Sequence, residues 1–350
     1  MSLYGTRDAA MNWQEEVAKE MSRWGFKRGK YNPCVYWHPQ TKLMVMVHGD
    51  DFMSVGTRAA AKAFKQKLEG RFEIKTQVVG SRGGVPIASR GTTTPEDLEE
   101  VSEARVLNRI VRCRPDGWEI EADQRHVDII VRDIGLSEAR PASTPGEPET
   151  RDDVELNEME LEGSEASRFR ALAARANYLA ADRPDIMYAT KEICRAMAKP
   201  THGAWKKLKR LGRYLAGSGR TVSKYEWQGE ESEITGYSDS DWAGCRVTGK
   251  SISGGALMCG GHYIKGWART QNHVTMSSAE AEFIALVKCS AELLGVRSML
   301  KGWEVDASDI IYADSSAALA IAKRKGAGKL RHINVASLWI QERQDTKELE

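Results

Sequence analysis

Three acidic residues in the last third of the chain lie where a mixed α/β fold can gather them at one point. Asp239 and Asp314 each end a short run of β-forming residues, and Glu282 lies in the first turns of an expected helix. A hard divalent cation needs such a cluster of carboxylate oxygens. The pattern favours a paired-metal phosphodiester hydrolase. Taken singly, each acid has a simpler explanation, because Asp is common in turns and Glu in first helical turns.

The order of elements around these acids narrows the interpretation. It runs strand with Asp, two strand-like runs, helix with Glu, strand with Asp, helix. The segments that carry this order are Gly236–Gly244 (GYSDSDWAG), Trp267–Leu286 (WARTQNHVTMSSAEAEFIAL) and Ile311–Ala322 (IYADSSAALAIA). Their arrangement and their residues resemble the ribonuclease H at the end of copia-type retrotransposon Pol polyproteins.

The resemblance extends upstream over nearly the whole chain, into the reverse transcriptase of the same family and its connection to ribonuclease H. The matching segments are Leu3–Gly5 with Trp13, Gly25–Cys34, Val45–Gly56, Arg140–Pro145, Asn177–Ala189 and Trp205–Leu215. Two segments, about residues 80–105 and 146–165, do not resemble the family.

By this resemblance the chain has a mixed α/β and α+β fold, with a partial palm and thumb followed by a ribonuclease H-like mixed sheet flanked by helices. The implied domains are a reverse transcriptase palm remnant (1–80), a flexible insert (81–105), a thumb-like region (106–146), an acidic linker (147–165), a helical connection (166–230) and a ribonuclease H-like domain (231–350). The family continues past Glu350. We therefore expect the last strand of a five-stranded sheet, and the helix after it, to be missing.

The implied chemistry is hydrolysis of the RNA strand of an RNA/DNA hybrid by two Mg²⁺ (or Mn²⁺) ions about 4 Å apart. By resemblance, Asp239 would bridge both ions, Glu282 would hold the ion nearer the leaving group, and Asp314 would hold the ion that activates water. The family's fourth carboxylate belongs to the missing helix, and Asn334 replaces the Asp of its His-Ile-Asp sequence. A catalytically inactive nucleic-acid-binding remnant is therefore the alternative.

Two further acids, Asp50 and Asp51, lie at the tip of an expected hairpin formed by residues 43–47 and 52–55. In isolation such a tip is a common solvated turn. In the family it is the palm hairpin of the polymerase, and its two Asp residues help to hold the metal ions. Another catalytic Asp of the family lies upstream of the first residue here. RNA-directed DNA synthesis on a template-primer would therefore need other parts of the Pol polyprotein.

Basic residues are segregated, although the net charge of the chain is only +2. Lys206, Lys207 and Arg210 share one expected helix, and Lys323 and Arg324 follow the last matched segment. A solvated face is the default interpretation of such groups. Beside a carboxylate site that takes a polyanionic substrate, phosphate contact is favoured, and we include His332 among the expected nucleic-acid-binding residues.

One motif points to a different function. Gly244–Ser251 (GCRVTGKS) fits the phosphate-loop pattern GxxxxGKS. A phosphate loop leads into a helix, because the amides at the helix N-terminus hold the phosphates. Residues 252–258 instead alternate like a strand and contain a pair of glycines. We therefore expect no nucleoside triphosphate hydrolysis.

Hydrophobic patterning gives the remaining elements. It predicts helices over residues 9–24, 59–70, 166–181, 184–198 and 203–216, strands over 35–37 and 72–74, and a hairpin around 115–117. Ser277 and Glu280 form an expected capping box at the start of the helix that carries Glu282. Residues 147–165 are strongly acidic and contain no aromatic residue, which is typical of a solvated linker.

The compartment follows from three absences in the sequence. The six cysteines form no CxxC pair or metal-ligand spacing, no apolar run reaches membrane-spanning length, and the N-terminus lacks the regions of a signal peptide. The sequence thus predicts reduced thiols, no membrane partner, and an intracellular protein of the cytoplasm or nucleus.

Overall fold

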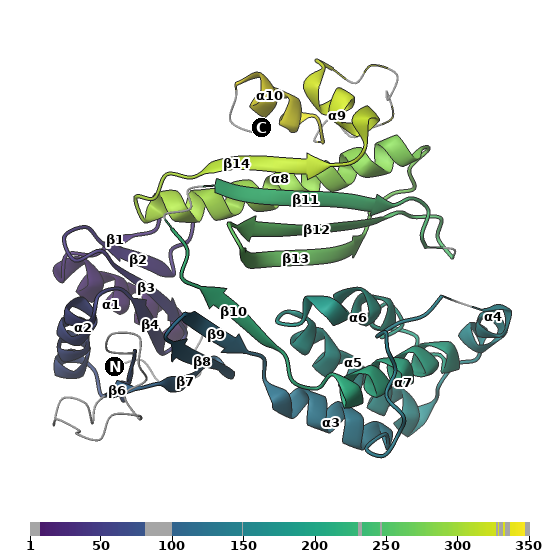
Figure 1. Ribbon diagram of the computed structural model, residues 1–350, viewed down its shortest axis with the longest axis horizontal. Helices are drawn as coiled ribbons and strands as arrows, with labels where there is room; N and C mark the ends of the chain where they lie inside the picture. Colours follow the sequence, from purple (N-terminus) through teal and green to yellow (C-terminus); the bar gives the residue numbers. More distant parts are fainter. Residues whose placement is uncertain are drawn as a thin grey trace.

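The computed structural model describes residues 8–80, 100–148, 150–229, 233–245, 247–326, 328, 332 and 337–346. Over these residues the chain is a mixed α/β structure with three four-stranded sheets and one two-stranded sheet (Figure 1). Most of the predicted flexible insert (81–105) lies outside the described residues. Its last part forms strands β6 (Glu100–Val101) and β7 (Glu103–Val106).

The N-terminal lobe, residues 8–80, places two helices on an antiparallel sheet. Its elements are α1 (Ala9–Arg23), β1 (Lys27–Arg28), β2 (Val35–His38), β3 (Leu43–His48), β4 (Asp51–Val55), α2 (Arg58–Arg71) and β5 (Val78–Val79). The strand order is β1-β2-β3-β4, and β5 pairs in parallel with β6. Val17 and Met21 of α1 and Phe64 and Leu68 of α2 are buried against the sheet, because both helices repeat apolar residues on one face.

The expected strand over residues 72–74 is wrong. Within the described part of the chain these residues have no strand partner, and Phe72 instead packs edge-on against Trp13 and Trp24, with ring centroids 5.3 and 6.4 Å apart. Aromatic packing within the lobe accounts for the apolar pattern that suggested a strand.

A second antiparallel sheet lies between the N-terminal lobe and the helices. It contains β7, β8 (Arg109–Arg114), β9 (Gly117–Glu121) and β10 (Val222–Glu226), in the order β10-β9-β8-β7. The hairpin predicted around residues 115–117 joins β8 to β9. Strand β10 arrives from about a hundred residues later and pairs with β9 in full register from Val222 to Glu226.

The helical lobe packs four helices and one 3₁₀ turn around one apolar core, and a further helix, α4, lies against α7. Its elements are α3 (Gln124–Ile134), α4 (Arg151–Glu158), α5 (Gly163–Ala180), η3 (Pro184–Ile186), α6 (Met187–Cys194) and α7 (His202–Gly217). Fully buried side chains from five of these elements meet in the core, namely Ile130, Phe169, Ile186, Ile193, Leu208 and Leu211. The helices predicted over 166–181, 184–198 and 203–216 correspond to α5, η3 with α6, and α7.

The acidic segment 147–165 differs from the solvated linker that its composition suggested, because it contains α4 and the start of α5. Leu161 is 6% exposed and its amide donates to the carbonyl of Pro200, while the amide of His202 donates to the carbonyl of Met159. Gly203 of α7 lies directly against Asn157. These backbone bonds and one apolar anchor fix the segment against α7, and composition averaged over the segment conceals them.

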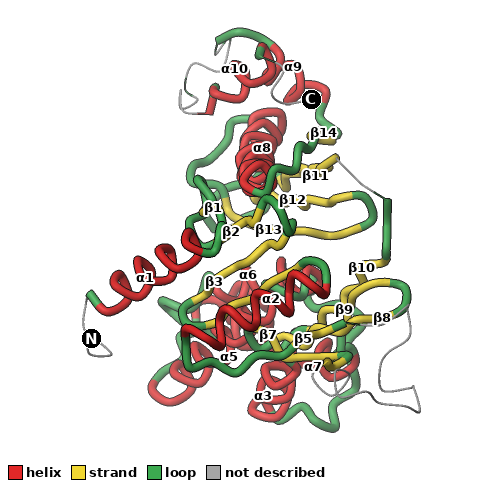
Figure 2. Tube along the Cα trace, turned by 90° about the vertical axis from the view of Figure 1, so that its left-hand side faces the viewer, coloured by secondary structure: helices red, strands yellow, loops and turns green. Residues whose placement is uncertain are grey.

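The C-terminal lobe, residues 233–346, contains β11 (Glu233–Asp241), β12 (Ile252–Cys259), β13 (His262–Thr270), α8 (Ser278–Gly302), β14 (Ser308–Ala313), α9 (Ser316–Lys323) and α10 (Trp339–Asp345). The order is β13-β12-β11-β14, with β14 parallel to β11 and the other pairs antiparallel. Helix α8 covers one face of this mixed sheet, as Figures 1 and 2 show from two sides. Gly236 permits this approach, since a Cβ there would lie 2.9 Å from Cys289 Sγ.

The phosphate-loop motif is a strand connection. Ser251 is followed directly by β12, and its buried hydroxyl lies 2.8 Å from the hydroxyl of Thr275. Strand β12 begins here, where a phosphate loop would lead into a helix, and this agrees with the strand-like alternation of residues 252–258. In the described part of the chain, no helix combines the length and apolar character that crossing a bilayer requires.

Candidate metal centre

Two neighbouring strands and one helix position the three acids. Asp239 lies near the end of β11, and Asp314 directly follows β14. These strands are parallel and pair Ser238 with Ala313, so the next residue on each strand is one of the two aspartates. Glu282 is in the second turn of α8, whose N-terminus reaches the same edge of the sheet.

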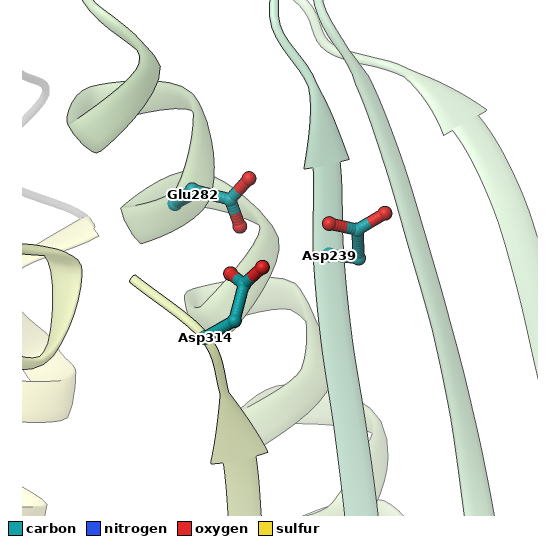
Figure 3. A group of neighbouring side chains, drawn as sticks. All are labelled: Asp239, Glu282 and Asp314. Carbon is teal, nitrogen blue, oxygen red and sulfur yellow. The ribbon is translucent and has the colours of Figure 1, made fainter. Parts of the chain in front are cut away.

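The three carboxylates converge, as the sequence predicted. One oxygen from each of Asp239, Glu282 and Asp314 lies within 4.8 Å of the others (Figure 3). Asp239 and Asp314 are exposed, whereas Glu282 is 9% exposed. Of the residues that the structure describes, this is the only group of three or more His, Cys, Asp or Glu side chains with metal-binding spacing.

Electrostatics at the centre are unfavourable without a cation. Burial, then the charges of Asp239 and Asp314, raise the pKa of Glu282 from 4.5 to about 7. Its Oε1 accepts a hydrogen bond from the amide of Ser240 at 3.1 Å, but its Oε2 is buried without a hydrogen-bond partner. An orphaned buried carboxylate oxygen beside two further carboxylates suits a hard divalent cation, so the residues present fit Mg²⁺ or Mn²⁺.

The N-terminus of α8 is held by a contact that the sequence did not reveal. The hydroxyl of Ser277 accepts from the amide of Glu280, as expected for a capping box. The Glu280 carboxylate, however, accepts from the amide of Met276 at 2.9 Å instead of from that of Ser277. Its Oε2 also lies 3.0 Å from Nε2 of His332, which was expected to contact nucleic acid and here contacts a buried carboxylate. The distance in sequence between these two residues hid the pair.

Asp50 and Asp51 lie at an exposed turn between β3 and β4, as predicted. His48 lies opposite Asp51 in the register of β3 and β4. The carbonyl of Gly49 accepts a hydrogen bond from the Trp13 indole at 2.8 Å. Among the described residues, no third metal-ligating side chain joins them in a cluster.

The predicted basic residues fall into two places. Lys206, Lys207 and Arg210 of α7 line a cavity of about 760 Å³ that Asp241 and Cys245 border from the C-terminal lobe. Arg210 is engaged inside the protein, since its guanidinium donates to Thr144 and pairs with Glu147 at 3.2 Å. Lys323 is exposed at the end of α9, and Arg324, which is only partly exposed, follows it.

Retrotransposon proteins resemble this chain in sequence. No model of a known protein family matches the chain. The Pol polyprotein of transposon TNT 1-94 from Nicotiana tabacum is 24% identical over 99% of the chain. That of transposon RE2 from Arabidopsis thaliana is 26% identical over 90% of it. An uncharacterized mitochondrial protein of Arabidopsis thaliana is 30% identical over 185 residues, which are 52% of this chain and 74% of that protein.

The chain belongs to the copia-type retrotransposon Pol family. It spans 25% of the length of the tobacco Pol polyprotein and 20% of that of the RE2 polyprotein. Among solved structures, a foamy viral protease-reverse transcriptase in complex with double-stranded DNA covers 97% of this copia-type chain and aligns over 48% of its own, with 9% identity and a TM-score of 0.46.

Proposed function

We propose that this copia-type chain hydrolyses the RNA strand of RNA/DNA hybrids with a pair of Mg²⁺ or Mn²⁺ ions held by Asp239, Glu282 and Asp314. The observation that carries the proposal is the meeting of these carboxylates within 4.8 Å at one end of a mixed sheet. Membership of the Pol family supports a nucleic acid as the substrate of such a site.

The protein's own residues bind and orient the reacting groups. The amide of Ser240 fixes one oxygen of Glu282, and the other is buried without a hydrogen-bond partner. A bound divalent pair supplies charge neutralisation, an activated water and stabilisation of the leaving oxygen. Exposure of Asp239 and Asp314 leaves the open side of the cluster accessible to a phosphodiester.

Basic residues would contact the phosphates of the hybrid around this centre. We assign this role to Lys206, Lys207 and Arg210 on the cavity and to Lys323 and Arg324 beyond α9, with His332 near Glu280 at the helix N-terminus. Asp50 and Asp51 would hold metal ions for a polymerase that acts on a template-primer. All six cysteines are free thiols, which supports action in the cytoplasm or nucleus.

The test is cleavage of a hybrid labelled on its RNA strand by the purified chain. We expect magnesium-dependent cutting that stops in excess chelator. Asp239→Asn, Glu282→Gln and Asp314→Asn should each lower the rate at least about a hundredfold, since each removes a ligand of the metal pair. Asp241→Asn is the matched control, because Asp241 is an exposed aspartate two residues along the same strand.

Loss of cutting in the control as well would remove the special role of the three acids. Binding of the hybrid without any cutting by the unmodified chain would favour the inactive nucleic-acid-binding remnant. Cutting that persists in Asp314→Asn at the parental rate would show that the metal ligands lie elsewhere.

A further inference from the structure

Two loops beside the carboxylate cluster expose large apolar side chains. The first, residues 242–245 and 247–251, follows the strand β11 that carries Asp239, and the second, residues 271–277, leads into the helix that carries Glu282. Trp242 of the first loop is 51% exposed, and Val274 and Met276 of the second are 56% and 74% exposed. We call these three side chains the rim. Contiguous exposed apolar side chains next to a polar site mark an interaction surface.

Hydrogen bonds join the two loops into one unit. The Trp242 indole donates to the carbonyl of Thr275 at 3.3 Å, and the Thr275 hydroxyl lies 2.8 Å from that of Ser251. Ser251 in turn accepts from the amide of Ala243 at 3.1 Å. Because Ser251 and Thr275 are buried, the loops hold the rim in a fixed orientation, so its exposure is a property of the folded surface.

Both loops place the rim next to the proposed reaction centre, one through β11 and the other through the start of α8. Trp242 is three residues beyond Asp239, which limits their backbone separation to about 10 Å. The amide of Met276 donates to the carboxylate of Glu280, two residues before Glu282. A substrate long enough to extend past the cluster would therefore meet these side chains.

Two basic side chains and an imidazole accompany the apolar ones. Lys250 lies in the first loop, His273 is exposed in the second, and Arg269 is exposed near the end of β13. Within the described ranges, none of the three forms an ion pair with a carboxylate of the protein. Aromatic and aliphatic faces mixed with cations complement a chain of nucleotides, in which apolar bases and sugars alternate with phosphates.

We infer that the rim binds the nucleotides next to the phosphodiester at the carboxylate cluster, with the Trp242 indole against a base or sugar face and Lys250 and Arg269 near flanking phosphates. This inference rests on the proposed function for its substrate class. It assigns Trp242 a positioning role, because the indole would fix where the strand lies relative to the three acids without touching the reacting atoms.

The experiment measures equilibrium binding of a fluorescent RNA/DNA hybrid by the full chain carrying Asp314→Asn, so that binding is read without cleavage. Adding Trp242→Ala should weaken binding about tenfold, within the range for loss of one stacked base. Trp242→Phe should retain affinity within about threefold, because the aromatic face is kept. Met276→Ser, which alters a side chain that is 74% exposed, should weaken binding about twofold to threefold.

Trp227→Ala is the matched control. Its indole is 62% exposed and donates to a backbone carbonyl, that of Pro115, at 3.0 Å, as the Trp242 indole does to Thr275, but it lies on the strand connection after β10. Its removal should leave hybrid affinity unchanged within about twofold, since no stacked base is lost. Thermal unfolding of each variant separates lost binding from lost folding.

The outcomes separate the rim from the proposed function. If the unmodified chain cleaves hybrids but Trp242→Ala and Trp227→Ala bind equally well, the rim assignment is overturned and a protein becomes its better occupant. If the unmodified chain never cleaves but Trp242→Ala selectively loses affinity, the hydrolase is rejected and the rim stands. Absence of hybrid binding by the parent chain overturns both. If Trp242→Ala does not fold, the hybrid affinities of Trp242→Phe and Met276→Ser decide whether the rim binds the hybrid.

Discussion

Glu282 is the residue that makes the cluster a site instead of a chance group of acids. Asp239 and Asp314 are exposed and can be solvated, but Glu282 is buried with one oxygen bonded to the Ser240 amide and the other without a partner. A buried carboxylate in this setting is costly when ionised, because it loses water and faces two like charges. Folding therefore brings together three carboxylates whose mutual repulsion only a bound proton or a bound cation can reduce.

A pH dependence of stability follows for the metal-free chain. The pKa of Glu282 is about 7 in the folded state and about 4.5 when unfolded, so the folded state binds the proton more tightly. Its stabilising contribution is complete below about pH 4.5 and is lost as the pH rises through about 7. Allowing for solvent screening, we expect the free energy of unfolding in chelator to fall by about 1–2 kcal/mol across this window.

Urea unfolding in chelator at several pH values between 4.5 and 8 measures this change. Glu282→Gln should remove its part of the slope, because the amide does not titrate, and it should raise stability at pH 8 relative to the parent. Magnesium should abolish the difference by stabilising the ionised cluster. If the free energy of unfolding changes equally with pH in Glu282→Gln and in the parent, other titrating groups cause the pH dependence.

At the scale of elements, β10 fixes the arrangement of the middle of the molecule. It comes after the whole helical lobe and returns to pair with β9, and its Tyr225 hydroxyl then donates to the carbonyl of Tyr263 in the C-terminal lobe at 3.4 Å. One strand thus connects the second sheet to the lobe that carries the metal centre. The pairing requires a close backbone approach at its last residue pair, Glu226 with Gly117.

Gly117→Ala tests this pairing. Gly117 has φ +154°, and a Cβ there would overlap the carbonyl of Tyr225. Because the obstacle is backbone, relief needs separation of β10 from β9, and we expect a loss of about 2–4 kcal/mol in the free energy of unfolding. Denaturant unfolding measures the loss, with Gly70→Ala as control, since a Cβ there meets nothing within 4 Å. Equal stability of the two variants would show that β10 tolerates displacement.

Local pattern accounts for the elements that the sequence predicted well. The apolar stripes of α1, α2 and α7 and the turn residues of the β8–β9 hairpin are short-range signals, and Asp239, Glu282 and Asp314 came from matched segments. What escaped prediction depends on distant partners. Helix α4 is held by residues 200–203, β10 by a strand a hundred residues earlier, and Glu280 by His332. No local window contains both members of these pairs.

At the scale of the whole molecule, specific contacts connect the lobes around the proposed site. Lys27 of the N-terminal lobe pairs with Glu304 after α8 at 2.7 Å. Arg195 of the helical lobe donates to Cys245 Sγ in the first rim loop at 2.6 Å. The second contact borders the cavity lined by Lys206 and Lys207, so the cationic face of α7 lies along the side of the loop that follows Asp239. A hybrid that reaches the metal centre could continue onto α7.

Salt dependence of hybrid binding tests this path. If Lys206 and Lys207 each neutralise a phosphate, binding releases a counterion at each contact, and the double change Lys206→Gln with Lys207→Gln should make the log–log salt slope shallower by about 1.5–2. Fluorescence anisotropy from 50 to about 300 mM salt gives the slope. Lys199→Gln is the control, because Lys199 precedes α7 and pairs with Glu160 at 2.6 Å away from the cavity lining. If the salt slope changes equally in both variants, the net charge of the protein governs binding, and not phosphate contacts along α7.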